Sequence, residues 1–279
     1  MLLRFGMIIE YYLVPMKFRY LKHKRRFMFK KIIPIAIICL FSLPSFAQVV
    51  GGKHNKLFNM FILEKYEDVY YKAFKMSEKE KHSREAEVYL YMTMALHKIA
   101  ENPDLEEQYP DAYEDILKFG GKFRKYADKA MEKEEETVTP ADNYDYLQEL
   151  KAYVLNETYF IFVERKYSKA ASRYRKVMKI FPDDENILFV AGISEMMSNN
   201  RQGQMKLDEF KTIVDEKYQN SSYEGDEVSN EYFGKTMKTW TNYLVTEGQA
   251  DEAKTWMKLA YKMLPENADI EEQYEKIMN

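Results

Sequence analysis

The residues of this sequence that could carry chemistry are few, and they do not stand at catalytic spacings. Downstream of residue 47 there are three histidines, His54, His82 and His97, whose separations do not match a metal-ligand motif. The sequence contains no H-E-x-x-H, no G-x-S-x-G, no P-loop and no G-x-G-x-x-G. We therefore predict no enzymatic activity, no metal site and no cofactor. We interpret the histidines as surface or helix-packing residues.

Acidic residues are numerous, but they are spread at helical intervals beside lysine and arginine. Such spacing is typical of a solvated helix face with i,i+4 ion pairs. The run EKEEE at 132–136 is interpreted in the same way, as a solvated helix end. The acids therefore indicate no catalytic pair, and binding is the function class that remains.

The composition indicates a helical protein. Glycine (10) and proline (8) are scarce in 279 residues, which argues against an all-β fold with many tight turns. Hydrophobic residues make up 46% and charged residues 31%, so the chain is globular rather than disordered or fibrous. We predict an all-α fold.

The first 47 residues have the layout of a secretory signal peptide. From Met28 the chain has two lysines, an apolar run from Ile32 to Leu43, and the small-residue ending Ser45-Phe46-Ala47. We predict that translation starts at Met28, that cleavage follows Ala47, and that residues 48–279 form the mature domain. The alternatives are an uncut membrane anchor and, for residues 1–27, a long basic leader. The short leader indicates a Gram-negative bacterium and a periplasmic location.

Removal of residues 1–47 changes the chemistry of the chain. The single cysteine, Cys39, lies in the apolar run without the neighbours of a lipoprotein signal, so the mature chain has no thiol. The mature chain keeps 33 basic and 44 acidic residues, a net charge of −11. Because phosphate neutralisation dominates nucleic-acid affinity, we predict no nucleic-acid partner. We also predict no stable membrane span after cleavage.

Two stretches lying 83 residues apart share one pattern of small and large side chains followed by proline. The positions are Ala170, Tyr174, Val177 and Pro182 in the first stretch, and Ala253, Met257, Ala260 and Pro265 in the second. Spacings of three and four place these side chains on one face of a helix, and proline ends each helix. A longer apolar helix precedes each, at 152–163 and 237–245.

This arrangement of helix, turn, helix and proline resembles the tetratricopeptide repeat (TPR). The resemblance is carried best by 234–267, through Trp240, Leu244, Gly248 and the second-helix positions above; Thr241 stands where the family has glycine. Weaker copies lie at 65–76 and 185–200. The segment 203–215 departs from the pattern at Gln204 and Asp208 unless residues are inserted. The segment 85–131 departs further, and its glycine pair at 120–121 indicates a kink or close packing.

The resemblance implies an α-solenoid of about five antiparallel helical hairpins. The five mature prolines fall between the expected helices, and Thr139-Pro140 is typical of a helix start. The polar segment 268–278 is predicted to form a C-terminal capping helix, because a terminal repeat otherwise leaves an apolar face in water.

In the family, the first helix of each hairpin lines a concave groove that binds a partner. Carried over position by position, the resemblance implies eleven groove residues: Leu155, Tyr159, Phe162, Asn186, Phe189, Ile193, Met196, Met197, Lys235, Lys238 and Asn242. An alternative for each is that it only packs against neighbouring helices. Lys238 and Asn242 are also similar to the start of a carboxylate clamp, but the two further repeats of that clamp are missing.

The sequence therefore predicts a non-catalytic scaffold or adaptor that binds a protein or peptide in a groove rich in aromatic residues and methionine. The alternative is a periplasmic binding protein for a small ligand, a glycan or a peptide. That alternative depends on tyrosines whose rings could stack on sugars, namely Tyr144, Tyr146 and Tyr153. The identity of the partner and the oligomeric state are left open.

Overall fold

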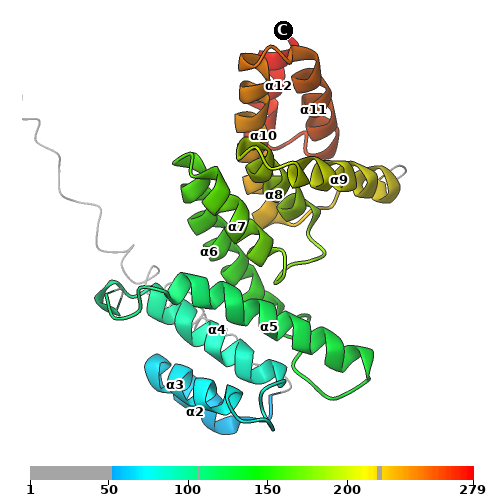
Figure 1. Ribbon diagram of the computed structural model, residues 1–279. Coiled ribbons are helices and arrows are strands. Elements are labelled where there is room, and N and C mark those ends of the chain that lie inside the picture. Colours follow the sequence, from blue (N-terminus) through cyan, green and yellow to red (C-terminus); the bar gives the residue numbers. More distant parts are fainter. Residues whose placement is uncertain (1–51, 106, 219–221) are drawn as a thin grey trace, which may run out of the picture. The chain divides into compact units, whose positions relative to one another are not determined.

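The computed structural model describes residues 52–105, 107–218 and 222–279, which belong to one compact unit. All regular structure in these ranges is helical (Figure 1). The α-helices are α2 (Asn55–Ile62), α3 (Tyr66–Ser77), α4 (Ala86–Ala100), α5 (Ala112–Glu132), α6 (Tyr144–Val163), α7 (Tyr167–Val177), α8 (Glu185–Met197), α9 (Gln202–Tyr218), α10 (Glu227–Thr246), α11 (Ala250–Met263) and α12 (Ala268–Met278). A short 3-10 helix, η1 (Pro103–Leu105), precedes α5. The predicted all-α class is confirmed.

Helices that follow one another in the sequence pack together in space. The pairs are α2 with α3, α4 with α5, α6 with α7, α8 with α9, and α10 with α11. Further contacts join one pair to the next: α3 to α4, α5 to α7, α7 to α8, and α10 to both α6 and α8. The C-terminal helix α12 covers the residues predicted for it and packs on α10 and α11.

Small residues set the close contacts within these pairs. Ala170 in α7 and Ala253 in α11 are fully buried, as their repeat positions predict. In α9 the equivalent contact is made by Gly203, where an added Cβ would lie 2.6 Å from the carbonyl oxygen of Gly192 in α8. Gly203, Leu207 and Phe210 therefore repeat the spacing of Ala170, Tyr174 and Val177 and are all buried.

Gln204 and Asp208 do not fit the repeat pattern because the pattern in α9 lies one position earlier, at Gly203 and Leu207. In the α8–α9 turn, Asn199 has a positive φ and lies four residues before Gly203, whereas Arg165 lies five before Ala170. The turn is one residue shorter, so the pattern starts earlier. No inserted residue is needed to bring α9 into line with the pattern of small and large side chains.

Among the described residues, four of the five hairpin turns share one backbone feature. Glu64, Arg165, Asn199 and Gly248 all have φ between 57° and 78° and follow the first helix of their pair. Only Gly248 adopts this left-handed conformation without a side-chain penalty. The other three turns have no glycine at this position, so the sequence marks only the turn of the last pair directly.

The glycine pair in α5 marks close packing, and the helix runs unbroken through it. A Cβ on Gly120 would lie 2.8 Å from Cδ1 of Ile180, and one on Gly121 would contact Lys179. Both partners follow α7, so the glycines let the α6–α7 pair approach α5. Of the two interpretations for 120–121, packing is the one that the structure shows.

The predicted helix start at Thr139-Pro140 is wrong by several residues. The hydroxyl of Thr139 accepts a hydrogen bond from the backbone N–H of Asp142 at 3.1 Å, as an N-cap would. This bond closes only a turn, and Asn143 occupies the N-cap position of α6. The Asn143 amide in turn donates to the carbonyl of Thr139 at 2.9 Å, so the turn is fixed against the helix that follows it.

The predictions for residues 1–47, including Met28, Cys39 and the cleavage after Ala47, lie outside the described residues. Among the residues that are described, no helix combines the length and the apolar character needed to cross a membrane.

Candidate binding surface

The helices α8 and α10 begin in the same way. Asp184 caps α8, its Oδ1 accepting from the N–H of Ile187 at 3.2 Å, and Asp226 caps α10, its Oδ1 accepting from the N–H of Ser229 at 3.1 Å. An aspartate here satisfies one of the free N–H groups of the first turn and complements the helix dipole. Both capping carboxylates point their second oxygen toward α6.

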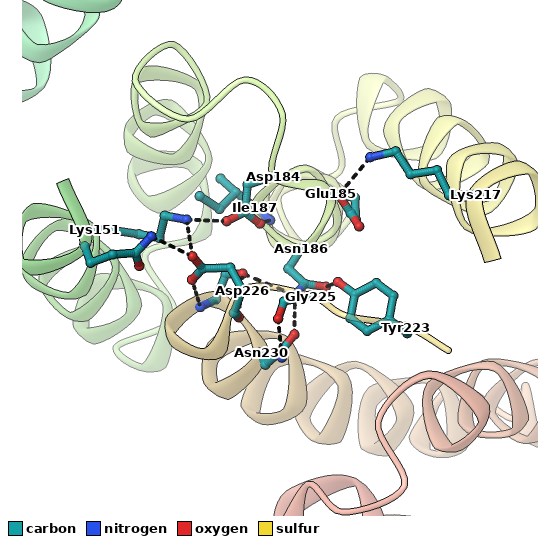
Figure 2. A network of polar contacts seen from close by, with 12 residues as sticks. Lys151, Asp184, Glu185, Asn186, Ile187, Lys217, Tyr223, Gly225, Asp226 and Asn230 are labelled. Atoms are coloured by element: carbon teal, nitrogen blue, oxygen red, sulfur yellow. Dashed lines mark hydrogen bonds and ion pairs between the residues drawn. The ribbon is translucent and has the colours of Figure 1, made fainter. Parts of the chain in front are cut away.

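Lys151 of α6 lies between these two carboxylates (Figure 2). Its Nζ is 2.9 Å from Oδ2 of Asp184 and 2.9 Å from Oδ2 of Asp226. The side chains of Lys151 and Asp184 are each 7% exposed, and that of Asp226 is 19% exposed. One buried ammonium therefore joins the starts of α8 and α10 to α6.

The ionisation of this cluster follows from burial and charge together. Burial raises the pKa of the Asp184 carboxyl, although Lys151 opposes the rise. Burial would lower the pKa of the Lys151 ammonium, but the two aspartates outweigh it and the pKa is raised. Burial would raise the pKa of the Asp226 carboxyl, but the hydrogen bond and charge of Lys151, with hydrogen bonds from Ser229 and Gln148, together outweigh it and lower the pKa. Lys151 is thus held in its charged form.

A second polar network holds the segment before α10 against α8. The Tyr223 hydroxyl donates to Oδ1 of Asn186 at 2.8 Å, and the Asn186 amide donates to Oδ1 of Asn230 at 2.8 Å (Figure 2). The Asn230 amide donates to the carbonyl of Gly225 at 3.2 Å. Tyr223 is therefore fixed over the first turn of α8.

These residues surround a hollow of about 430 Å³, which we call the Lys151 hollow. Its wall mixes aromatic, charged and amide side chains: Arg124, Tyr144, Gln148, Lys151, Phe181, Asp183, Asp184, Glu185, Lys217, Tyr218, Tyr223, Glu224 and Asp226. The volume falls within the range of small-molecule sites.

A second hollow, of about 660 Å³, lies at the C-terminal ends of α6, α8 and α10. We call it the aromatic hollow; its lining is Tyr159, Phe162, Val163, Arg165, Tyr167, Met197, Thr239, Asn242, Tyr243 and Thr246. Val163 is 57% exposed and Tyr243 is 37% exposed, so apolar surface faces solvent there.

The aromatic hollow has a basic rim. Arg165 and Tyr167 also line an adjoining hollow of about 750 Å³, together with Lys166 and Lys169. Lys166 pairs with Glu164 at 2.8 Å, and both side chains are more than half exposed. Positive charge therefore collects beside apolar surface on a domain that is acidic as a whole.

The structure separates the eleven predicted groove residues into two groups. Five are buried between helices: Leu155, Phe162, Asn186, Phe189 and Ile193. Phe189, for example, contacts the rings of Phe210, Phe233 and Trp256 from three other helices. A partner that docks on the folded protein does not reach these five, apart from the edge of Phe162 in the aromatic hollow.

The other six are half-buried. Tyr159, Met197 and Asn242 line the aromatic hollow, and Met196 and Lys235 are also partly exposed. Lys238 is engaged by α12, at 2.7 Å from Glu272 and 3.5 Å from Asp269. The amide oxygen of Asn242 likewise accepts from Gln273 and Lys276 of α12, each at 3.0 Å.

The sequence analysis missed the Lys151 cluster, although a signal for its acids is present. The dipeptide Asp-Glu occurs at 184–185 and at 226–227, where the aspartate is the N-cap and the glutamate the first residue of α8 and α10. An acid that precedes an apolar helix is an N-cap signal. Nothing in the sequence distinguishes Lys151 from the other helix lysines, because its partners lie on distant segments.

Comparison with known proteins does not assign this chain to a family. No protein-family model and no curated protein matches this chain.

Proposed function

We propose that this protein is a non-catalytic scaffold that binds a peptide segment of a partner protein in the aromatic hollow. The observation that carries the proposal is the hollow itself, where apolar side chains stay exposed beside a basic rim. Exposed apolar surface rimmed by polar groups marks interaction sites. The occupant that fits is an extended acidic segment with bulky apolar side chains.

The arrangement of the helices supports this proposal. The hollow lies where α6 and α8 end and along the second half of α10, which are the first helices of three hairpins. In the TPR-like solenoid that the sequence resembles, first helices face the partner. Methionine adapts to irregular apolar ligands, and Met197 lies in the wall. Export through residues 28–47 would place such a scaffold in the bacterial periplasm or cell envelope.

Panning a random-peptide phage library against the purified protein tests the proposal. We expect enrichment of peptides in which large apolar residues adjoin Asp or Glu. The enriched peptides should bind the variants Val163→Ser and Arg165→Glu at least about tenfold more weakly, because one loses apolar contact and the other reverses the rim charge. Glu64 and Glu134 have a positive φ like that of Arg165, so we expect glutamate to be tolerated there.

The matched control is Lys254→Glu, which reverses an exposed charge on α11 away from the hollow lining. It should leave peptide affinity unchanged. The proposal fails if no peptide is enriched, or if Lys254→Glu weakens binding as much as Arg165→Glu does.

The Lys151 hollow supports the second candidate, a small-ligand binder. Tyr144, 59% exposed, and Phe181 line this hollow next to carboxylates, the mixture that holds a sugar. Of the other two tyrosines, Tyr146 is buried in the core, and the ring of Tyr153 lies tilted against that of His97 with centroids 4.7 Å apart. A thermal-shift screen with glycans separates the candidates: a rise in melting temperature that Tyr144→Ala abolishes favours the small-ligand binder.

A further inference from the structure

Two histidines that are distant in the sequence meet near the N-terminal end of α4. His54 is the N-cap residue of α2, His82 lies in the loop between α3 and α4, and Glu85 is the N-cap residue of α4. Oε2 of Glu85 is 2.7 Å from Nε2 of His54 and 2.9 Å from Nδ1 of His82. The three ligand atoms all lie within 4.8 Å of one another.

The cluster is held from behind. The carboxylate of Glu87 accepts two backbone hydrogen bonds, from the N–H of Lys53 at 2.7 Å and from the N–H of His54 at 2.8 Å. The two imidazole rings meet edge to face, with centroids 5.5 Å apart. The histidine side chains are 19% and 18% exposed, and that of Glu85 is 38% exposed. The site is therefore positioned by main chain as well as by side chains, and it stays open to solvent.

We propose that His54, His82 and Glu85 bind a zinc ion. Two imidazole nitrogens and one carboxylate oxygen are a donor set that zinc takes at about 2.0–2.2 Å, with water in the fourth position. Ligands at that distance from a tetrahedral ion lie about 3.3 Å apart. Oε2 of Glu85 lies at 2.7 Å and 2.9 Å from the two ring nitrogens, somewhat closer than this, so the side chains have to separate slightly to admit an ion.

The charges around the cluster favour a cation. Glu85 places a carboxylate against both imidazole rings. Glu87, Glu135 and Glu136 line the hollow of about 120 Å³ beside it, and Arg84 and Lys53 are its basic residues. Lys53 pairs with Glu136 at 3.3 Å.

The ion would add to the hydrogen bonds that already join the start of α2 to α4. Its ligands come from the start of α2, the loop before α4 and the start of α4. The site lies apart from both hollows, so this inference does not depend on the proposed function. The prediction of no metal site was drawn from motif spacing, which cannot detect ligands that come from separate segments.

Isothermal titration calorimetry of the untagged protein with zinc chloride tests the inference. We expect about one zinc ion per chain, and affinity reduced roughly 10- to 100-fold or more in His82→Gln and in Glu85→Gln. Replacement of zinc by Co²⁺ should give the ligand-field absorption of a four-coordinate nitrogen and oxygen site, and both variants should lose it.

Glu135→Gln is the matched control, because it removes an acid from the same hollow without touching the three ligands. Far-ultraviolet circular dichroism of each variant shows whether the helices are retained; if His82→Gln unfolds, the result for Glu85→Gln decides. The inference is overturned if wild-type protein binds no zinc, if both ligand variants bind as wild type does, or if Glu135→Gln weakens binding equally.

Discussion

At the starts of α8 and α10 a buried lysine joins two aspartates, whereas at the ends of α6, α8 and α10 the side chains are aromatic and aliphatic. The first region is the Lys151 cluster, with ion-pair distances of 2.9 Å. The second is the aromatic hollow, where Tyr159 packs edge to face with Tyr232 at 5.6 Å. The same helices thus carry charge at one end and apolar surface at the other.

The backbone explains the difference. A helix start has free N–H groups that can take an acceptor; Asp184 and Asp226 supply one to α8 and α10, and Lys151 offsets their charge. The helix ends satisfy their carbonyls with the main chain: the N–H of Lys166 donates to the carbonyl of Ile161, and the N–H of Gln249 to that of Leu244. Side chains at the ends are therefore free to be apolar.

The Lys151 cluster should carry the larger share of stability. We predict that Lys151→Met lowers the free energy of unfolding by about 3–5 kcal/mol, because two partly buried carboxylates then lose their counter-ion. Urea denaturation followed by circular dichroism measures the change. A loss below about 1 kcal/mol would show that water replaces the lysine and that the Lys151 cluster does not hold α6, α8 and α10 together.

A compensating variant sharpens the test. Asparagine caps a helix about as well as aspartate does, and it is uncharged. Adding Asp184→Asn and Asp226→Asn to Lys151→Met should therefore restore most of the lost stability. Lys254→Met on the exposed face of α11 is the control and should change stability by no more than about 0.5 kcal/mol.

His97 is a buried base that lacks the two carboxylate partners of Lys151, so we expect it to lose its charge in the folded protein. His97 in α4 is 2% exposed in its side chain, and burial lowers its pKa to about 4 despite Glu101 at 3.6 Å. The unfolded chain, with a histidine pKa of about 6.5, takes up the proton first as pH falls. Stability is therefore complete above about pH 6.5 and falls by about 3 kcal/mol toward pH 4.

Urea denaturation of the wild type and His97→Gln at several pH values checks this prediction. The variant lacks the titrating ring, so its stability should depend less steeply on pH between about 6.5 and 4. If the stability of the wild type and of the variant depended equally on pH, His97 would be protonated in the folded state. The single acid Glu101 would then be enough to keep a buried base charged, whereas Lys151 has two carboxylates.

The sequence predicted which helices form and pack together better than it predicted which side chains are exposed. Residues 268–278 form α12 as predicted, because a polar cap before an amphipathic run is a local signal. Ala170 in α7 and Ala253 in α11, the small residues predicted to let a neighbouring helix approach, are fully buried. Exposure depends on segments far away: Phe189 faces no groove, because Phe210, Phe233 and Trp256 enclose it.

The candidate sites show the same limit. Tyr159, Met197 and Asn242 were predicted for a groove and do line the aromatic hollow. Lys151 and the pair of His54 and His82 were not predicted as sites, since each joins segments that only the fold brings together. Local spacing predicts a helix face, but it does not predict which distant face will meet it.

The smallest effect on stability should come from the aromatic hollow. Val163→Ser alters a side chain that is 57% exposed and should change the free energy of unfolding by no more than about 0.5 kcal/mol, whereas Tyr243→Ser also removes a ring stacked on Trp240 and should cost about 1 kcal/mol. The same variants should weaken binding of an acidic-apolar peptide. Stability and binding then separate along one set of helices. If either substitution instead destabilises the fold as much as Lys151→Met does, then its side chain holds the helix ends together. The aromatic hollow would then contribute to stability as the Lys151 cluster does.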